Sequence, residues 1–332
     1  MNRTTNGLVA ALSVAAGAVA AAAMVKAASS HGAPMDGPAA RALRTARNAG
    51  PLAARRAASE DRVDAHIHAA RAFNRSSALL AWSALADSAV EHYRGSFENR
   101  AMYTPLIVGT LSLAAGLHGD ADRVGNRHRV RHAIYLAAAG VGVAGTGFHL
   151  YNVTKRPGGF SWHNLFYGAP LGAPMALLLS GALGAVGERL RDEPAHAPRL
   201  FGMPAGQALA LLAAAGMIGT VGEVALLHFR GAFQHRAMYA PVTIPPIATA
   251  LLVRAALAPP RFNVWTRVWL RMTAALGVVG VAFHVRGVAR NQGGWRNWSQ
   301  NILNGPPLPA PPSFTALATA ALAALRLRDT ER

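Results

Sequence analysis

Two stretches of this sequence decide the fold: HYRGSFENRAMYTP at positions 92–105 and HFRGAFQHRAMYAP at positions 228–241. They begin 136 residues apart and agree at nine of fourteen positions, in the order His, Arg, Gly, Phe, Arg, Ala, Met, Tyr and Pro. A shared apolar composition does not produce an ordered series of His, Arg, Tyr and Pro matches. We therefore interpret the pair as an internal duplication, which has to be recognised before any other feature of the fold is assigned.

The similarity resumes downstream in the same order. The matching pairs are 145–149 (GTGFH) with 280–284 (GVAFH), 158–160 (GGF) with 293–295 (GGW), and 168–174 (GAPLGAP) with 305–311 (GPPLPAP). The sequence thus predicts two copies of one unit, repeat 1 over 76–200 and repeat 2 over 201–328.

The composition indicates a membrane protein. Hydrophobic residues make up 52% of the chain, charged residues only 14%, and the mean hydropathy is +0.21. Apolar runs such as 205–227 and 266–285 are long enough to cross a bilayer core, which takes about 20 residues of helix. Each copy contains four such runs. They are predicted as helices over 77–93, 102–118, 132–150 and 170–187 in repeat 1, and over 205–228, 238–257, 266–285 and 308–327 in repeat 2.

An even number of helices per copy makes the two copies cross the membrane in the same direction, as parallel repeats do in some transporters. The predicted fold class is therefore an all-α integral membrane protein with two tandem parallel repeats of a four-helix unit, eight transmembrane helices in all. Residues 1–26 form an apolar segment that is either an additional N-terminal helix or signal-like. Residues 27–75 are basic, and we expect them to be partly disordered and to lie on anionic lipid.

The distribution of positive charge predicts the orientation. A net charge of +18 would favour nucleic acid as the partner of a soluble protein, but here the basic residues lie between apolar runs. Of the 33 Lys and Arg, 23 fall on one side of the eight predicted helices and nine on the other. The positive-inside rule then predicts a bacterial-type inner membrane protein with a cytoplasmic C-terminus and no nucleic-acid partner. The absence of cysteine excludes disulfides, thiolate haem ligation and cysteine-ligated iron–sulfur clusters.

Ionisable residues within spanning helices are costly and point to function. Two histidines recur in both copies, His92 with His228 and His149 with His284, and a carboxylate recurs as Asp87 and Glu223. Imidazole and carboxylate together suit a metal ion, and paired imidazoles suit haem. Five residues of helix turn the chain by about 140° beyond a full turn, so Asp87 and His92 do not share a helix face. The alternative is that these histidines only form hydrogen bonds between structural elements.

Two pairs of arginines recur as well. Arg94 and Arg230 follow the histidines, and Arg100 and Arg236 come six residues later. They are candidates for binding an anion or a quinone oxygen, with anchoring at the membrane interface as the plainer explanation.

These residues leave three functions open. The leading one is an outward-side His/carboxylate site that binds a metal ion or haem and exchanges electrons with a membrane or redox partner. The alternatives are a transporter or channel for a small solute or proton, and a structural membrane subunit. The sequence does not decide whether the chain is an enzyme.

Overall fold

The computed structural model describes residues 51–168, 171–192, 199–200, 202–261 and 263–330. The predicted segment 1–26 and the first half of 27–75 lie outside these residues. Within them, all regular structure is helical apart from one two-stranded antiparallel hairpin, β1 (Arg199–Leu200) with β2 (Met203–Pro204). The all-α fold class is therefore confirmed.

Eight long helices carry the fold. They are α3 (Pro51–Arg94), α4 (Thr104–Ala121), α5 (Arg129–Thr154), α7 (Gly172–Asp192), α8 (Ala205–Arg230), α9 (Ala240–Leu257), α10 (Val264–Arg290) and α12 (Pro312–Thr330). The short elements between them are η1 (Arg100–Tyr103), α6 (Trp162–Tyr167), η2 (Arg236–Tyr239), η3 (Gly294–Asn297) and α11 (Trp298–Asn304). Seven of the long helices begin and end within a few residues of their predicted ranges. The exception is α3, which begins at Pro51 rather than at residue 77, in a stretch rich in the helix-favouring residues Ala and Arg.

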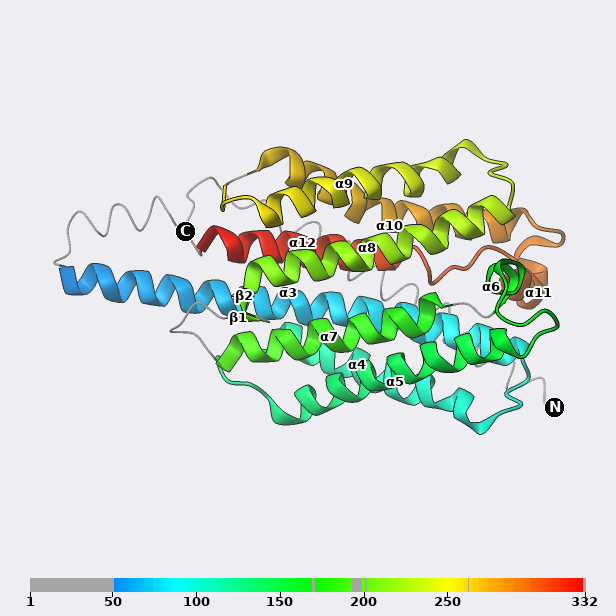
Figure 1. The fold of residues 1–332 in the computed structure, drawn as a ribbon, viewed down its shortest axis with the longest axis horizontal. Coiled ribbons are helices and arrows are strands. Elements are labelled where there is room, and N and C mark those ends of the chain that lie inside the picture. Colours follow the sequence, from blue (N-terminus) through cyan, green and yellow to red (C-terminus); the bar gives the residue numbers. More distant parts are fainter. Residues whose placement is uncertain (1–50, 169–170, 193–198, 201, 262, 331–332) are drawn as a thin grey trace.

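Five of these helices are long and apolar enough to cross a membrane, so the chain is a multi-pass membrane protein. They comprise α5, α8 and α10, together with η1–α4 and η2–α9 taken as continuous spans. In α9, Pro245 and Pro246 lie inside the helix, an arrangement that spanning helices tolerate because neighbouring groups satisfy the freed carbonyls. The other three long helices, α3, α7 and α12, run along the middle of the bundle (Figure 1). Several of their described polar side chains are buried in protein, among them Ser77, Glu188 and Thr315. The count of eight spans stays a prediction.

The long helices pack as two groups of four (Figure 1). In the first group α3 and α5 each pack against α4 and α7, and in the second α8 and α10 each pack against α9 and α12. The order of the four long helices and their packing partners are the same in both groups. We call these groups the first half and the second half. They join mainly through α3 and α12.

The two ends of the bundle differ in character. One end, which we call the aromatic end, holds α6, α11 and the turns at 94–103 and 230–239; the other, the basic end, holds the 122–128 loop, the β1–β2 hairpin and the end of α12. Side chains of both halves form one hydrophobic core near the basic end, including Phe73, Leu183, Leu209, Met217 and Leu327. Near the aromatic end the halves separate and leave a cavity.

Glycines allow close helix contacts in both halves. A Cβ added to Gly142 of α5 would lie 2.4 Å from the backbone nitrogen of Leu178 in α7. A Cβ added to Gly277 of α10 would lie 2.2 Å from the Thr315 hydroxyl oxygen in α12. Small residues at such crossings are typical of helix packing in lipid.

Candidate functional site

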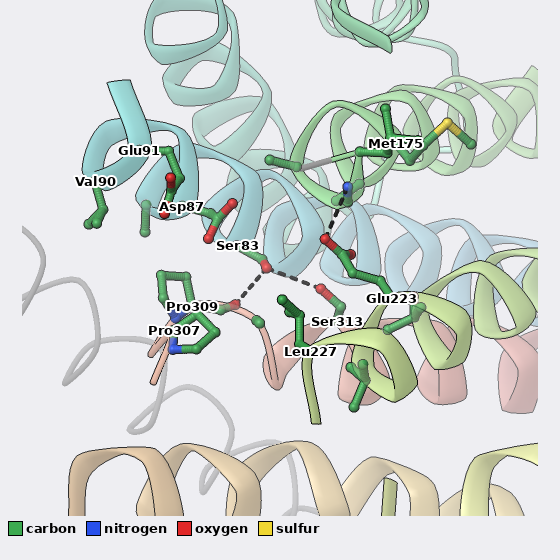
Figure 2. A pocket seen from close by; sticks show the side chains of 18 of the residues that line it. Ser83, Asp87, Val90, Glu91, Met175, Glu223, Leu227, Pro307, Pro309 and Ser313 are labelled. Carbon is green, nitrogen blue, oxygen red and sulfur yellow. Dashed lines mark hydrogen bonds between the residues drawn. The ribbon is translucent and has the colours of Figure 1, made fainter. Parts of the chain in front are cut away.

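A cavity of about 1810 Å³ lies between the two halves, towards the aromatic end. Its wall is formed by α3, α7, α8 and the residues leading into α12, and α6 and α11 contribute aromatic and aliphatic side chains. The lining is predominantly apolar, and Figure 2 shows part of it. The volume exceeds the roughly 300–1,000 Å³ of most small-molecule pockets, so there is room for a bulky or long-chain ligand.

The carboxylates predicted as site residues both line this cavity. Asp87 projects from α3 and Glu223 from α8, and they lie close enough for their charges to interact (Figure 2). Each stands seven residues before an arginine at the end of its helix, which puts it about 10 Å below the helix end at 1.5 Å per residue. The backbone N–H of Gly172 donates a hydrogen bond to Glu223 Oε1 at 3.2 Å. One carboxylate from each half therefore faces a single shared space.

Hydroxyl groups fasten one wall of the cavity. Ser83 Oγ on α3 donates to the carbonyl oxygen of Pro309 at 2.6 Å and lies 3.0 Å from Ser313 Oγ on α12 (Figure 2). One further hydrogen bond joins the same helices nearer the basic end, between Ser76 Oγ and Thr319 Oγ1 at 3.1 Å. The α3–α12 side of the cavity is therefore a fixed junction between the halves.

The predicted arginines separate into two pairs with different positions. Arg94 and Arg230 line the cavity at its rim. Arg94 donates to Glu91 Oε1 at 2.7 Å, and the Arg230 guanidinium lies 5.3 Å from the centre of the Tyr167 ring. Arg100 and Arg236 begin η1 and η2, are exposed, and are not among the cavity-lining residues.

The two recurring histidines at the ends of α3 and α8 close identical turns. His92 Nδ1 lies 2.7 Å from the carbonyl oxygen of Met102, and His228 Nδ1 lies 2.8 Å from that of Met238. Each turn contains two non-glycine residues with positive φ, Ser96 and Phe97 in the first and Ala232 and Phe233 in the second. Such left-handed residues persist only where surrounding contacts hold them. The imidazole–carbonyl hydrogen bond supplies one such contact, so these histidines have a structural role.

The other two histidines lie beside the first two. His149 on α5 is within electrostatic reach of His92, and His284 on α10 is within reach of His228. His284 Nδ1 lies 2.7 Å from the carbonyl oxygen of Pro307. His149 Nδ1 is buried without a hydrogen-bond partner among the described residues, and the equivalent of Pro307 in repeat 1, residue 170, lies outside them.

The histidines and the carboxylates thus occupy separate places. The structure forms one histidine pair per half, and the described cavity lining contains none of the four. The separation follows from helix geometry, because Asp87 and His92 point in directions about 140° apart. In the part of the chain that is described, no three His, Cys, Asp or Glu side chains are grouped so that they would hold a metal ion. The structure therefore gives the predicted metal or haem centre no support.

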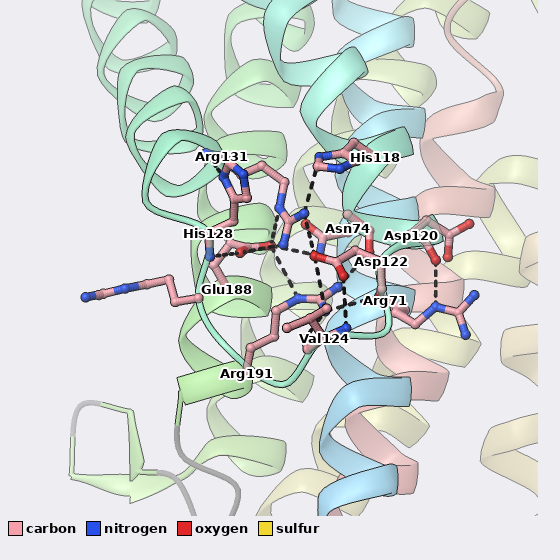
Figure 3. Close-up of polar contacts among 12 residues, drawn as sticks. Arg71, Asn74, His118, Asp120, Asp122, Val124, His128, Arg131, Glu188 and Arg191 are labelled. Carbon is pink, nitrogen blue, oxygen red and sulfur yellow. Dashed lines mark hydrogen bonds and ion pairs between the residues drawn. The ribbon is translucent and has the colours of Figure 1, made fainter.

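A buried polar network at the basic end was missed by sequence reasoning (Figure 3). Glu188 of α7 is fully buried between two buried arginines: its Oε1 lies 3.0 Å from Arg131 Nε and 3.5 Å from Arg191 Nε. Asn74 donates to the same carboxylate, and Tyr135 donates to Asn74. The second half has Leu325 where Glu188 stands and Thr266 where Arg131 stands, by the alignment of the repeats. Arg191 has a counterpart in Arg328, which donates to carbonyl oxygens of Ala256 and Ala258. Glu188 and Arg131 have no such counterpart, so a search for duplicated polar residues passes over their ion pair.

Asp122 lies in the loop after α4, beside Arg131 and Arg191 of this network, and its pKa is lowered. Burial alone would raise the pKa of this carboxyl group, but the Val124 N–H and the Arg131 guanidinium both donate to it, and the net effect is a pKa below its ordinary value. Arg191 donates to the carbonyl oxygens of Gly119 and Val124, at 2.6 and 2.8 Å. These bonds join the end of α4 to α7, so the network is a structural clamp at the basic end.

Comparison with known proteins adds no family to these observations. No protein-family model matches the sequence, and neither the curated proteins nor the solved structures include a significant match.

Proposed function

We propose that this chain is a membrane transporter that binds a lipophilic cation in the cavity between its two halves. The observation that carries the proposal is the placement of Asp87 and Glu223, one from each half, in a single predominantly apolar cavity. An apolar wall favours the body of such a ligand, and the carboxylates favour its charge.

The charge balance of the cavity supports a cation. Ionised carboxylates are costly away from water unless they are paired, and carboxylates within the membrane usually mark the path or site of a ligand. Among the described residues, no ion pair within 4.0 Å involves Asp87 or Glu223. The nearer rim arginine, Arg94, is paired with Glu91. A bound cation would supply the missing partner.

The internal duplication supports a transporter more than a simple receptor. The equivalent packing of the two halves and the equivalent turns at His92 and His228 favour two copies of a four-helix unit with eight spans. Both copies would then cross the membrane in the same direction, with the ligand site at their interface, as in transporters built from parallel repeats. The cavity ends at the shared hydrophobic core on the side of the basic end and extends from there towards the aromatic end, so the ligand site would lie on one side of the core.

The orientation belongs to the same proposal. The excess of Lys and Arg on the basic end favours a cytoplasmic location of that end and of the C-terminus in a bacterial-type inner membrane, where anionic lipid would attract the basic segment. Two exposed asparagines at opposite ends, Asn99 and Asn126, provide a matched test in a chain without cysteine. A cysteine at 99 should react with an impermeant maleimide from outside, and one at 126 only after permeabilisation. Labelling of both from one side would contradict this topology.

Transport is tested with tetraphenylphosphonium, a permanent lipophilic cation, loaded into proteoliposomes. Wild-type protein should accelerate release of the cation relative to loaded liposomes that contain no protein. Asp87→Asn should remove that acceleration. Glu98→Gln is the matched control, because Glu98 is an exposed loop carboxylate and repeat 2 has Gln234 at the equivalent position. Equal release rates from liposomes with wild-type protein, with Asp87→Asn and with no protein would refute the proposal.

A redox role for the histidines is the second candidate. The carbonyl bonds at Nδ1 of His92 and His228 fix the ring orientation and leave Nε2 as the atom available to a ligand, an arrangement common for imidazoles that bind metals. Two imidazoles per half would meet the axial requirement of one haem. The purified protein should then show a haem absorption band that His149→Ala abolishes. A spectrum without such a band, with no metal by elemental analysis, would exclude this candidate.

A further inference from the structure

The two junctions between the halves are unequal, although the repeat makes them equivalent. By the alignment of the repeats, α3 against α12 corresponds to α8 against α7. The first pair packs extensively and is fastened by the Ser83–Ser313 and Ser76–Thr319 hydrogen bonds. The second pair touches at few places, chiefly where the Glu223 side chain reaches Gly172 and where Leu179 approaches Gly216. The cavity therefore has one fixed wall and one loose wall.

The cavity is covered at both ends of the bundle. Towards the basic end, the first half of α8 is buried in the common core; its buried residues run from Ala205 and Gly206 to Gly216 and Met217. Towards the aromatic end, α6 of the first half lies against the end of α8, where the Phe166 and Phe229 rings meet edge to face at 6.0 Å. Trp295 and Trp298 line the cavity there from the second half, and α11 contacts α3. The short helices thus cross from each half onto the other.

The loose wall is apolar and open. On α7 its lining includes Met175, which is 39% exposed, and on α8 it includes Ala215, Gly219 and Gly222. A Cβ added to Gly219 or Gly222 would meet no atom within 4 Å, so these positions face empty space. The Thr220 hydroxyl on the same helix donates to the Gly216 carbonyl and is thereby satisfied. Glu223 is left as the charged group at the inner edge of this wall.

We infer that the cavity opens to the bilayer between α7 and α8, and that its ligand is a cation dissolved in the membrane that reaches Asp87 and Glu223 from the lipid. This inference rests on the proposed function for the identity of the ligand. An apolar lateral opening favours a ligand that partitions into lipid, because a strongly hydrated cation would lose its hydration in crossing the wall. The two carboxylates at the end of the path supply the charge complementarity. Met175, Ala215 and Gly222 border the path.

The route of access is tested by narrowing it. Gly222→Leu fills the space beside the loose wall. Gly147→Leu is the matched control, because both residues are exposed helical glycines whose added Cβ would meet nothing within 4 Å. Gly147 does not line the cavity. The association rate of tetraphenylphosphonium is measured with the full chain in lipid nanodiscs. Gly222→Leu should slow association by about tenfold, a shift within the range usual for variants of one site, while Gly147→Leu should match wild type. Equal rates for both variants would overturn the lateral route and leave the proposed function intact.

A second measurement needs no ligand and so separates the two claims. A nitroxide at Ala215→Cys should collide more with oxygen, which concentrates in lipid, than with a water-soluble nickel chelate. Its accessibility should resemble that of Ala144→Cys, an exposed position on α5, and differ from that of Asn99→Cys in the turn at the aromatic end. More frequent collision with the nickel chelate than with oxygen at position 215 would show a water-filled opening and overturn the inference. If wild type binds no tetraphenylphosphonium while the oxygen pattern holds, the proposed ligand fails and the lateral opening stands.

Discussion

Asp87 and Glu223 are 136 residues apart in the sequence, yet they face one cavity from α3 and α8, close enough for their charges to interact. Neither half contains this site alone. The two carboxylates stand at matching positions of the repeated sequence pattern and line one predominantly apolar space. Variants of the cavity and variants of the buried contacts should therefore have different effects, the first on ligand binding and the second on stability.

The first prediction concerns the buried network of the first half. Glu188→Leu should lower the free energy of unfolding by about 3–5 kcal/mol, because it removes the buried carboxylate between Arg131 and Arg191 and leaves them only Asp122 as an acidic partner. The double variant Glu188→Leu/Arg131→Thr introduces the residues of the second half, Leu325 and Thr266, and should recover a large part of that loss. Denaturant unfolding in detergent measures both. A double variant no more stable than the single one would show that the charge pair is not the source of the effect.

A pH dependence is expected from Asp122. Its pKa is lower in the folded protein than in the unfolded chain, so the carboxylate stabilises the fold fully above its unfolded pKa of about 3.9. That contribution is lost as the pH falls through the folded pKa. Asp122→Asn should therefore flatten the acid side of the stability profile below about pH 4. An unchanged acid limb in the variant would contradict the assignment.

The close contact between α5 and α7 at Gly142 should leave no room for a side chain at that position. Gly142→Ala places a methyl group against the α7 backbone at Leu178 and should cost about 1–3 kcal/mol of stability. Gly140→Ala on the same helix meets open space and should be neutral or slightly stabilising, since Ala favours helix. Thermal unfolding temperatures of the two variants decide the matter. Equal temperatures would mean that α5 and α7 do not cross as closely as described.

The turn histidines should affect stability and leave the cavity intact. His92→Ala and His228→Ala each remove one hydrogen bond to a methionine carbonyl and should cost about 0.5–1.5 kcal/mol. Because neither residue lines the cavity, the tetraphenylphosphonium affinity should stay at the wild-type value. A large loss of affinity in either variant would move the ligand site to the histidines.

Much of the fold was predictable from the sequence, since apolar runs and the repeated His-x-Arg-Gly element locate seven of the eight long helices within a few residues. The start of α3 at Pro51 was not, because the preceding stretch has helix propensity but little apolar periodicity. The candidate site was predicted only in part. Their recurrence singled out Asp87 and Glu223, and both line the cavity. The sequence also predicted that they share a site with the four histidines, but the structure places the histidines elsewhere.

The cavity and the buried network could not be predicted from the repeated sequence pattern, because the pattern shows only which positions are equivalent. A repeat identifies equivalent residues, such as His92 and His228, without saying which residues of different helices face one another. The cavity depends on the loose α7–α8 junction, and the Glu188 network depends on Glu188 and Arg131, which are Leu325 and Thr266 in the second half. Both arise from differences between the copies, which a search for similarity does not detect.

The central claim is that one cation is shared by the two halves, and the stoichiometry of binding tests it most directly. Tetraphenylphosphonium titrated into the protein in nanodiscs should saturate at one molecule per chain. Asp87→Asn and Glu223→Gln should each weaken that single site by about tenfold or more, equivalent to at least about 1.4 kcal/mol, and Glu98→Gln should match wild type. Two molecules per chain, with each cavity variant removing one and leaving the other at full affinity, would show that each half has its own site and would contradict the account.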